Sequence, residues 1–400
     1  MTTFIYGTGN PAKLQSMRDC LASLKINIIG LKEIGIDIPN VEENGNTPLE
    51  NARIKALDYY KAIKRPVFAC DSGLYIDGLS DDEQPGVHVR MRNGKRLNDD
   101  EMIEHYAAIA NRLGGKAVAR YKNAICFVVS ESEIYEHFGD DISGDTFCFV
   151  DKPHPKRIEG FPLDCLSVHI ESGEYYYWHR PGGDVGMMNK GFQEFFGKVL
   201  AQREMVRHYD ALIDENNDPV YDPVPLREHM DKWDGAPFIE ALQLAPEKSV
   251  LEIGVGTGRL AVRVSDKCKS FTGIDISPKT IERAKENLQG FQNVCLIHGD
   301  FLTHIFDKEF DVIYSSLTFM HIKNKQSAIQ KVASLLIPYG RFVLSISKDR
   351  KKTLDFGNRQ VEVYSDTPDE ITALMTEAGL EIEKQFETEY AVIFVARKET

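Results

Sequence analysis

The chain has 400 residues, and its 48 lysines and arginines against 61 aspartates and glutamates give a formal net charge of −13. This length predicts two domains, and the acidic balance argues against duplex DNA or long RNA as a partner. The seven cysteines are scattered without a C-x-x-C pair, which predicts a reduced cytoplasmic protein, and no stretch approaches the roughly 20 apolar residues of a membrane span.

The first predicted element is an apolar strand from Thr3 to Tyr6, followed by the sequence GTGNPAKL. No basic segment precedes a long apolar run here, so we expect no signal peptide. Gly7 and Gly9 permit a turn, Asn10 can cap the next helix, and Lys13 falls in the first turn of that helix. A lysine there opposes the helix dipole, which a bound anion would rationalise, although an ordinary solvated lysine is the alternative.

Four further segments follow in the first half. VEENG at 41–45 precedes TPLENARIKA at 47–56, which predicts a capped helix carrying Lys55. A buried strand is predicted at 66–70, with Asp71 of DSGL at its end, and PGVHVR follows at 85–90. A turn-capping aspartate is the structural alternative for Asp71.

Together these motifs resemble the inosine triphosphate pyrophosphatase family, which hydrolyses non-standard purine nucleoside triphosphates to monophosphate and pyrophosphate. The family pattern of TGN-x-x-K, E-x-G, ENA-x-x-KA, DSGL and PGV occurs here in order. RYKNAICFVV from Arg120 and GFPLD at 160–164 extend the match. The resemblance implies a mixed α/β domain over residues 1–203, which commonly dimerises in this family.

The resemblance also implies how the site would work. Mg²⁺ would be held by Glu43 (or Glu42) and Asp71, and Asp71 would orient or deprotonate the attacking water. Lysines would balance the charge of the phosphates. The side chains expected to contact the triphosphate substrate are Thr8, Asn10, Lys13, Lys55, Ser72, Phe161, Asp164 and Lys190.

Two departures from the family pattern support a second hypothesis. Cys70 stands where the family has the first of two consecutive acids, and the segment 186–196 lacks the Ser-His-Arg element that contacts the base. The first half could therefore be a catalytically degenerate nucleotide-binding or dimerisation module. The aromatic run YYYWH at 175–179 predicts a strand at a hydrophobic interface, with a base-stacking surface as the alternative.

Residues 204–236 are rich in acids, prolines and aromatics and show no strand period. They predict a connector and a small helical lid. Tyr209, Tyr221 and Trp233 are mild candidates for the wall of a substrate pocket, and the favoured alternative is that they anchor the connector.

The next strand, Ser249 to Glu252, runs into three glycines at alternate positions. These are Gly254, Gly256 and Gly258. A tight turn needs residues without Cβ, and a helix from about Arg259 would point unpaired N–H groups at a ligand there. Dinucleotide enzymes use a similar turn, but the G-x-G-x-G spacing and Glu252 argue against a dehydrogenase.

A second strand, FTGIDIS, ends at Asp275, about 20 residues on, where an acid can meet ribose hydroxyls. Asp300 in IHGDF is placed to hold an adenine amino group. This order resembles the class I S-adenosylmethionine-dependent methyltransferases over residues 237–400, which implies a Rossmann-like seven-stranded domain. The implied cofactor-binding residues are Glu252, Gly254, Gly256, Gly258, Asp275, Ile276, Asp300, Phe301 and Ser315.

Alternating helices and strands continue to the end of the chain, which predicts a parallel sheet covered on both faces. Helices are expected at 279–288, up to 336 and at 368–378, and strands at 294–297, 310–314, 342–346 after a PYG turn, 380–386 and 390–396. The last two strands should form the antiparallel hairpin of the methyltransferase fold.

The loop SSLTFMHI at 315–322 follows a strand of this sheet and should lie beside the transferred methyl group. His321 is the candidate base, with a helix-capping or core histidine as the alternative. The acceptor is expected to be a small molecule, and the fusion suggests one derived from a nucleotide.

Overall fold

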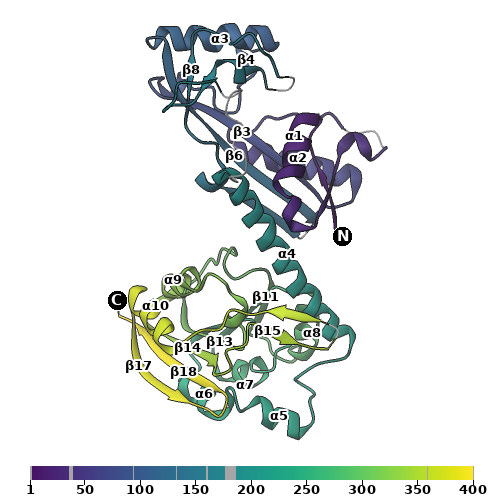
Figure 1. Ribbon diagram of the computed structural model, residues 1–400. Helices are drawn as coiled ribbons and strands as arrows, with labels where there is room; N and C mark the ends of the chain where they lie inside the picture. Colours follow the sequence, from purple (N-terminus) through teal and green to yellow (C-terminus); the bar gives the residue numbers. More distant parts are fainter. Residues whose placement is uncertain are drawn as a thin grey trace. The chain divides into compact units, whose positions relative to one another are not determined.

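The computed structural model describes residues 2–35, 39–92, 94–131, 133–158, 161–175, 186–357 and 359–399. Two compact units, Met1–Leu200 and Ala201–Thr400, make up the chain, and the division falls within helix α4, Met187–Asp214 (Figure 1). Gly160 of GFPLD and residues 176–179 of the aromatic run lie outside the described residues. Among the described helices, none combines the length and the apolar character needed to cross a membrane.

The first unit is built on a mixed sheet with the order β2-β1-β3-β6-β8-β9, and β7 pairs with the long strand β6. Strand β1 is parallel to β2 and β3, whereas the pairs from β3 onwards are antiparallel. The strands are β1 (Thr3–Tyr6), β2 (Asn27–Gly30), β3 (Val67–Ile76), β6 (Lys116–Ser130), β7 (Glu133–Phe138), β8 (Phe147–Val150) and β9 (Ser167–Val168). A separate short hairpin joins β4 (Met91–Arg92) and β5 (Lys95–Arg96).

Helices bury apolar side chains against this sheet. Helix α1 (Pro11–Cys20) and the first turns of α4 share a core with Phe4, Phe68 and Phe127. Helix α2 (Pro48–Ile63) contributes Ala52 and Ala56 to a second core beside Ala69 and Ala124, where small side chains allow close packing. Helix α3 (Asp99–Arg112) packs on the part of the sheet that includes β8.

One strand boundary differs from the sequence prediction in a way that matters for the site. The strand expected to end before Asp71 continues to Ile76, so the prediction that Asp71 stands at a strand end was wrong. The reason is the partner strand: β3 pairs with β6 without interruption from Val67 to Ile76. Because β1 pairs with β3 only as far as Phe68, Asp71 lies just beyond the end of β1.

The second unit has a seven-stranded sheet with the order β12-β11-β10-β13-β14-β18-β17. The pairs from β12 to β14 are parallel, and β18 pairs antiparallel with β14 and β17, which confirms the predicted closing hairpin. The strands are β10 (Ser249–Ile253), β11 (Ser270–Asp275), β12 (Val294–His298), β13 (Phe310–Ser316), β14 (Leu336–Ser347), β17 (Leu380–Glu387) and β18 (Ala391–Lys398).

Helices cover both faces of this sheet, as the alternating pattern predicts (Figure 1). Helices α9 (Lys325–Leu335) and α10 (Pro368–Glu377) share one core, and α6 (Gly235–Ala241), α7 (Ala261–Val264) and α8 (Pro278–Asn287) share the other. A small hairpin of β15 (Thr353–Asp355) and β16 (Gln360–Glu362) lies between β14 and α10 in the sequence. Before the sheet, α4 ends at Asp214 and a short α5 (Val224–Met230) follows.

Two local predictions in this unit need correction. The helix expected from about Arg259 is only the four-residue α7, and a 3₁₀ turn, Ser265–Lys267, follows it. The PYG segment is not a turn before a strand but part of β14. Tyr339 takes a φ of 63° there, and the register between β13 and β14 shifts, so a bulge in the strand replaces the turn.

Candidate active sites of the two units

The turn after β1 is held against β3 and leads into α1. The Gly7 N–H donates to the Phe68 carbonyl at 2.7 Å, and the Asn10 N–H donates to Thr8 Oγ1 at 3.2 Å. The Asn10 side chain accepts from the Ala12 N–H at 2.9 Å, which caps α1 as the sequence predicts. These hydrogen bonds fix Thr8 and Asn10 just after the end of β1, beside the part of β3 that leads to Asp71.

Three predicted site residues of the first unit meet at one point. Lys55 Nζ lies 2.7 Å from Asp71 Oδ1 and 3.1 Å from Glu43 Oε2. Asn51, one turn earlier on α2, donates to Asp71 Oδ2 at 3.3 Å and accepts from the Gly45 N–H at 2.8 Å. A Cβ at Gly45 would lie 2.7 Å from Asn51 Oδ1, which explains the glycine of VEENG. Sequence reasoning placed Asn51 on the helix but missed this bridging role.

The charges around Asp71 perturb one another. Burial raises the pKa of Asp71, and the attraction of Lys55 opposes this rise. Desolvation lowers the pKa of Lys55, but Asp71 and Glu43 outweigh it, so the pKa rises overall. Desolvation around the ammonium lowers the pKa of Lys13, although the residue as a whole is exposed, and the charge of Lys55 lowers it further. Two ammonium groups close enough to repel each other are expected where a polyanion binds.

The donor atoms at this point suit a magnesium ion. Carboxylate oxygens of Glu43 and Asp71 both lie within 3.1 Å of the Lys55 ammonium, so the two acids reach one common point, which that ammonium occupies. Mg²⁺ prefers oxygen ligands and commonly uses one or two carboxylates together with waters and substrate phosphates. Glu43 and Asp71 therefore fit the ion that the sequence predicts.

Cys70 does not take part in this group. Side chains alternate along a strand, so Cys70 and Ser72 point to the opposite face of β3 from Asp71. Cys70 packs on the core that contains Tyr6, and burial raises the pKa of its thiol to about 12. A neutral thiol on the other face is no ligand for the cation position between Glu43 and Asp71.

The remaining predicted substrate residues lie elsewhere in the first unit. Phe161 precedes the 3₁₀ helix Pro162–Leu166, where burial raises the pKa of Asp164 to about 6. Asp164 acts electrostatically on Tyr121, and Lys190 is exposed in the first turns of α4. Within the described parts of the chain, no contact joins Asp164 or Lys190 to the Lys55–Asp71 pair.

In the second unit the glycine-rich turn has the conformation that its sequence requires. Gly254, Gly256 and Gly258 take φ values of 76°, 57° and 98°, a region that side chains with a Cβ rarely occupy. A Cβ on Gly254 would lie 2.0 Å from Thr318 Oγ1, whereas a Cβ on Gly256 would meet nothing within 4 Å. The turn is therefore tightly backed at Gly254 and open at Gly256, where a ligand could lie against the backbone.

Asp275 faces this turn from the end of β11. Its Oδ2 accepts from the Gly256 N–H at 3.0 Å and its Oδ1 from the Ser277 N–H at 3.0 Å. Burial raises the pKa of Asp275, and these backbone donors oppose the rise. Each carboxylate oxygen keeps a second lone pair, so Asp275 can also accept from a pair of ribose hydroxyls. The turn and the acid thus form a cradle that fits S-adenosylmethionine.

Glu252, in β10 just before the turn, is buried. The residue is 3% exposed, and its Oε2 accepts from the Tyr314 hydroxyl at 2.8 Å. Burial raises the pKa of Glu252 to about 8, although the Tyr314 hydrogen bond and the nearby Arg259 oppose the rise. The carboxyl group is therefore largely protonated near neutral pH.

We expect Glu252→Gln to gain stability relative to the wild type as the pH rises from about 5 to about 8. An unfolded glutamate ionises near pH 4.3, so above that pH the unfolded chain loses a proton that the folded protein retains, and folding is penalised. Glutamine removes this penalty, which we estimate at roughly 4–5 kcal/mol at about pH 8. Calorimetric unfolding at both pH values measures the difference in unfolding free energy between variant and wild type. The relevant transition is the one that S-adenosylhomocysteine shifts, because it belongs to the second unit. Glu247→Gln, an exposed acid, is the control, and a gap independent of pH would contradict the expectation.

The other predicted cofactor residues follow the neighbouring strands. Asp300 is half-buried after β12 and accepts from the Leu302 N–H at 2.8 Å. Phe301 is buried beside it, and Ile276 is half-buried directly after Asp275. The Gly299 N–H donates to the Asp275 carbonyl at 2.9 Å, which brings Asp300 close to the cradle. Ser315 is fully buried in β13 and donates to the Ile253 carbonyl at 3.0 Å, so its hydroxyl is already engaged.

A buried ion pair behind the turn was missed by sequence reasoning. Asp234 is 0% exposed and pairs with Arg259, whose Nη1 lies 3.0 Å from Asp234 Oδ1. Ser316 donates to Asp234 Oδ2 at 2.7 Å, and the Gly235 N–H donates to Oδ1 at 2.8 Å. Removing one partner of such a pair would leave a buried charge uncompensated. The signal in the sequence was an arginine directly after the third glycine.

His321 is brought to the second unit's candidate site together with a residue of α4. Its Nε2 lies 2.7 Å from the hydroxyl oxygen of Tyr209. Burial lowers the pKa of His321 to about 4, so the ring is neutral at physiological pH. Of the other aromatic candidates, Tyr221 is 74% exposed, and Trp233 packs on Tyr390 with ring centroids 4.6 Å apart. Trp233 therefore has an anchoring contact.

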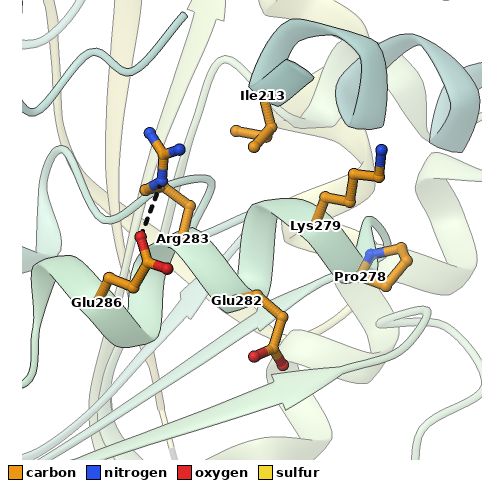
Figure 2. A pocket seen from close by; sticks show the side chains of 6 residues that line it. All are labelled: Ile213, Pro278, Lys279, Glu282, Arg283 and Glu286. Carbon is orange, nitrogen blue, oxygen red and sulfur yellow. Dashed lines mark ion pairs between the residues drawn. The ribbon is translucent and has the colours of Figure 1, made fainter. Parts of the chain in front are cut away.

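A shallow hollow lies between α4 and α8 in the second unit. It is lined by Ile213, Pro278, Lys279, Glu282, Arg283 and Glu286. Figure 2 shows Ile213 projecting from α4 towards the other five residues on α8. Lys279 pairs with Asp214 at 2.6 Å and Arg283 with Glu286 at 3.1 Å, so its cations are already neutralised. The hollow includes none of the predicted cofactor residues.

Comparison with known proteins finds a separate match for each half. A family model described as Ham1 family matches residues 4–161, and one described as Methyltransferase domain matches residues 244–386. A dITP/XTP pyrophosphatase of Clostridium tetani is 34% identical over 167 residues, which cover 38% of this chain and 82% of that protein. A dITP/XTP pyrophosphatase of Oceanobacillus iheyensis is 36% identical over 104 residues. These residues are 26% of this chain and 52% of that protein, so the chain spans about half the length of this relative. The structure of the N-methyltransferase NodS of Bradyrhizobium japonicum with S-adenosylhomocysteine has a TM-score of 0.39 at 18% identity, covering 50% of this chain and 100% of that one.

Proposed function

Because this chain belongs to the Ham1 family and carries a methyltransferase domain in its second half, we propose that it is a bifunctional enzyme. Residues 1–203 would form a Mg²⁺-dependent nucleoside triphosphate pyrophosphatase, and residues 237–400 an S-adenosylmethionine-dependent methyltransferase. Residues 204–236 would serve as connector and helical lid. The pyrophosphatase substrates would be non-standard purine triphosphates such as dITP and XTP, the compounds in the names of the relatives.

The observation that carries the pyrophosphatase proposal is that Glu43 and Asp71 meet at Lys55. Mg²⁺ held by these two carboxylates would neutralise charge on the triphosphate. Asp71 would accept a proton from the attacking water, and Lys55 and Lys13 would stabilise the charge that develops on the leaving pyrophosphate. Thr8 and Asn10 would donate hydrogen bonds to phosphate oxygens. Ser72, which points to the other face of β3 from Asp71, remains with Phe161, Asp164 and Lys190 a candidate for contacts with the rest of the substrate.

The observation that carries the methyltransferase proposal is the hydrogen bond between Asp275 and the open Gly256. Asp275 would bind the ribose hydroxyls of S-adenosylmethionine, Asp300 the adenine amino group, and Ile276 and Phe301 the faces of the base. Gly254, Gly256, Gly258 and Ser315 would shape the cradle, with Glu252 supporting it from below. The cofactor supplies an activated methyl group, so the protein must chiefly align a small-molecule acceptor, with His321 as its base.

A calorimetric titration tests the cofactor assignment directly. We expect S-adenosylhomocysteine to bind and NAD to show no heat of binding, because the glycine spacing and Glu252 disfavour a dinucleotide. The opposite pattern would replace the methyltransferase proposal by a dehydrogenase.

A degenerate first unit is the second candidate function. A cysteine in place of an acid at Cys70 and the missing Ser-His-Arg element motivate it, and Asp164 and Lys190 have no described contact with Asp71. Such a module would bind a triphosphate without hydrolysing it. Pyrophosphate release measured over a panel of purine triphosphates separates the two cases, because any robust turnover rules out the degenerate module.

The expected partners and location of the protein follow from its composition and family resemblance. We propose a homodimer formed through the first domain, no duplex nucleic acid partner in view of the net charge of −13, and a cytoplasmic location. The seven cysteines, none of which is in a disulfide, suit a reducing compartment.

A further inference from the structure

Tyr209 and His321 meet above the carboxyl ends of the strands that form the cofactor cradle. Tyr209 lies on α4, and its neighbour Asp210 accepts from the Ser277 hydroxyl at 2.7 Å, two residues after Asp275. His321 ends the 3₁₀ helix Phe319–His321, which begins directly after the Thr318 that backs Gly254. The Tyr209–His321 pair is thus tied to both sides of the proposed cofactor site.

The two ring nitrogens of His321 differ in their hydrogen bonding. Nε2 lies 2.7 Å from the Tyr209 hydroxyl oxygen, whereas Nδ1 is buried and has no hydrogen-bond partner among the residues that the structure describes. A buried polar atom without a partner is uncommon in folded proteins and calls for an explanation, such as a catalytic role or a ligand. A methyl acceptor bound next to Nδ1 would supply both the ligand and the catalytic role.

Several titratable groups surround the pair, and each comes from a different part of the unit. His208 of α4 and Lys325 of α9 act on His321, and both disfavour a positive charge on its ring. Lys325 is itself paired with Asp366 at 3.0 Å. The negative charge of Asp275 acts on the Tyr209 phenol. Burial raises the pKa of that phenol as well, so both members of the pair are neutral near pH 7.

We infer that Tyr209 is a positioning residue that holds His321 with its proton on Nε2, so that the Nδ1 lone pair can accept a proton from the methyl acceptor. A neutral imidazole has one donor nitrogen and one acceptor nitrogen. With the proton on Nε2, the donor is satisfied by the Tyr209 oxygen, and the phenol hydrogen can turn towards the charge of Asp275. With the proton on Nδ1, a buried N–H would have no acceptor, which is costly.

This inference rests on the proposed methyltransferase function and narrows its substrate. The acceptor is a molecule whose nucleophilic nitrogen or oxygen still carries a proton. The bond from this atom to the methyl carbon forms while the carbon–sulfur bond breaks, and the sulfur keeps that electron pair. The proton of the nucleophile passes to His321 Nδ1, giving an imidazolium ion that later releases it to water. An acceptor that is already deprotonated would need no such base.

The test reads the tautomer itself by NMR. Long-range ¹H–¹⁵N correlation spectra of the full chain with ¹⁵N-labelled histidine, assigned through His321→Gln, should show His321 as the Nε2–H tautomer near pH 7. Tyr209→Phe removes only the hydroxyl and should convert this signal to a mixture of tautomers. Tyr339→Phe, on an exposed tyrosine in β14, should leave it unchanged.

The outcomes separate this inference from the proposed function. An Nδ1–H tautomer in the wild type, or a spectrum that Tyr209→Phe does not change, overturns the inference. Calorimetry with S-adenosylhomocysteine on the same samples reports the cofactor site independently. Binding with the wrong tautomer therefore overturns only the role of Tyr209, whereas the right tautomer without binding overturns the methyltransferase assignment and leaves the positioning contact.

Discussion

Asp71→Asn is expected to lower the rate of pyrophosphate release from XTP by about 100-fold or more, because it removes the carboxylate that we propose as the base acting on the attacking water. Asparagine has nearly the shape of aspartate, so the contact with Asn51 can persist. The neutral amide loses the 2.7 Å ion pair with Lys55 and offers the metal a weaker ligand than a carboxylate. A coupled assay for pyrophosphate at saturating Mg²⁺ measures the loss.

Asp77→Asn is the matched control for this experiment. Asp77 directly follows β3, six residues after Asp71, but its side chain is exposed and makes no contact with the Lys55 group among the described residues. We expect its rate to equal that of the wild type. Full activity in Asp71→Asn would exclude Asp71 as base and metal ligand together.

Asp275→Ala should weaken the binding of S-adenosylhomocysteine by roughly 10- to 100-fold, because the ribose loses a charged hydrogen-bond acceptor worth about 1.5–3 kcal/mol. The substitution also leaves the N–H groups of Gly256 and Ser277 without their present acceptor, so the turn itself loses support. Isothermal titration calorimetry with the wild type and the variant gives the ratio of dissociation constants.

Asp311→Ala is the control for the structural part of this effect, because it removes a carboxylate that supports the backbone away from the cofactor site. Asp311 also accepts from a backbone N–H, that of Ser249, at 2.8 Å, but at the opposite ends of β10 and β13 from the glycine-rich turn. We expect lower stability with unchanged affinity for S-adenosylhomocysteine. Equal affinity losses in both variants would mean that Asp275 supports the sheet and does not bind the cofactor.

Much of the fold could be predicted because its signals are local. The two families inferred from motifs are confirmed by the family models, and the seven-stranded order with its closing hairpin is confirmed by strand pairing. Glycines at alternate positions after β10 and an acid at the end of β11 define the cradle within about 25 residues of sequence. Asn10 and Thr47 cap the helices that they were expected to cap.

The errors have a non-local cause. Whether β3 ends at Cys70 or Ile76 depends on β6, some 50 residues later, which supplies hydrogen bonds beyond Asp71. The partner of His321 lies 112 residues away on α4, and the partner of Arg259 lies before the sheet at Asp234. No period or spacing in a single sequence contains these pairings. Strand alternation was readable, however, and would have placed Cys70 and Asp71 on opposite faces if the strand had been continued.

The central claim is that the first unit hydrolyses a triphosphate between its α and β phosphates despite Cys70. Phosphorus-31 NMR of the wild-type protein incubated with XTP and Mg²⁺ tests it most directly. We predict that the triphosphate resonances are replaced by those of the monophosphate and pyrophosphate in equal amounts. Unchanged XTP resonances, or the appearance of orthophosphate and diphosphate nucleotide, would contradict the claim.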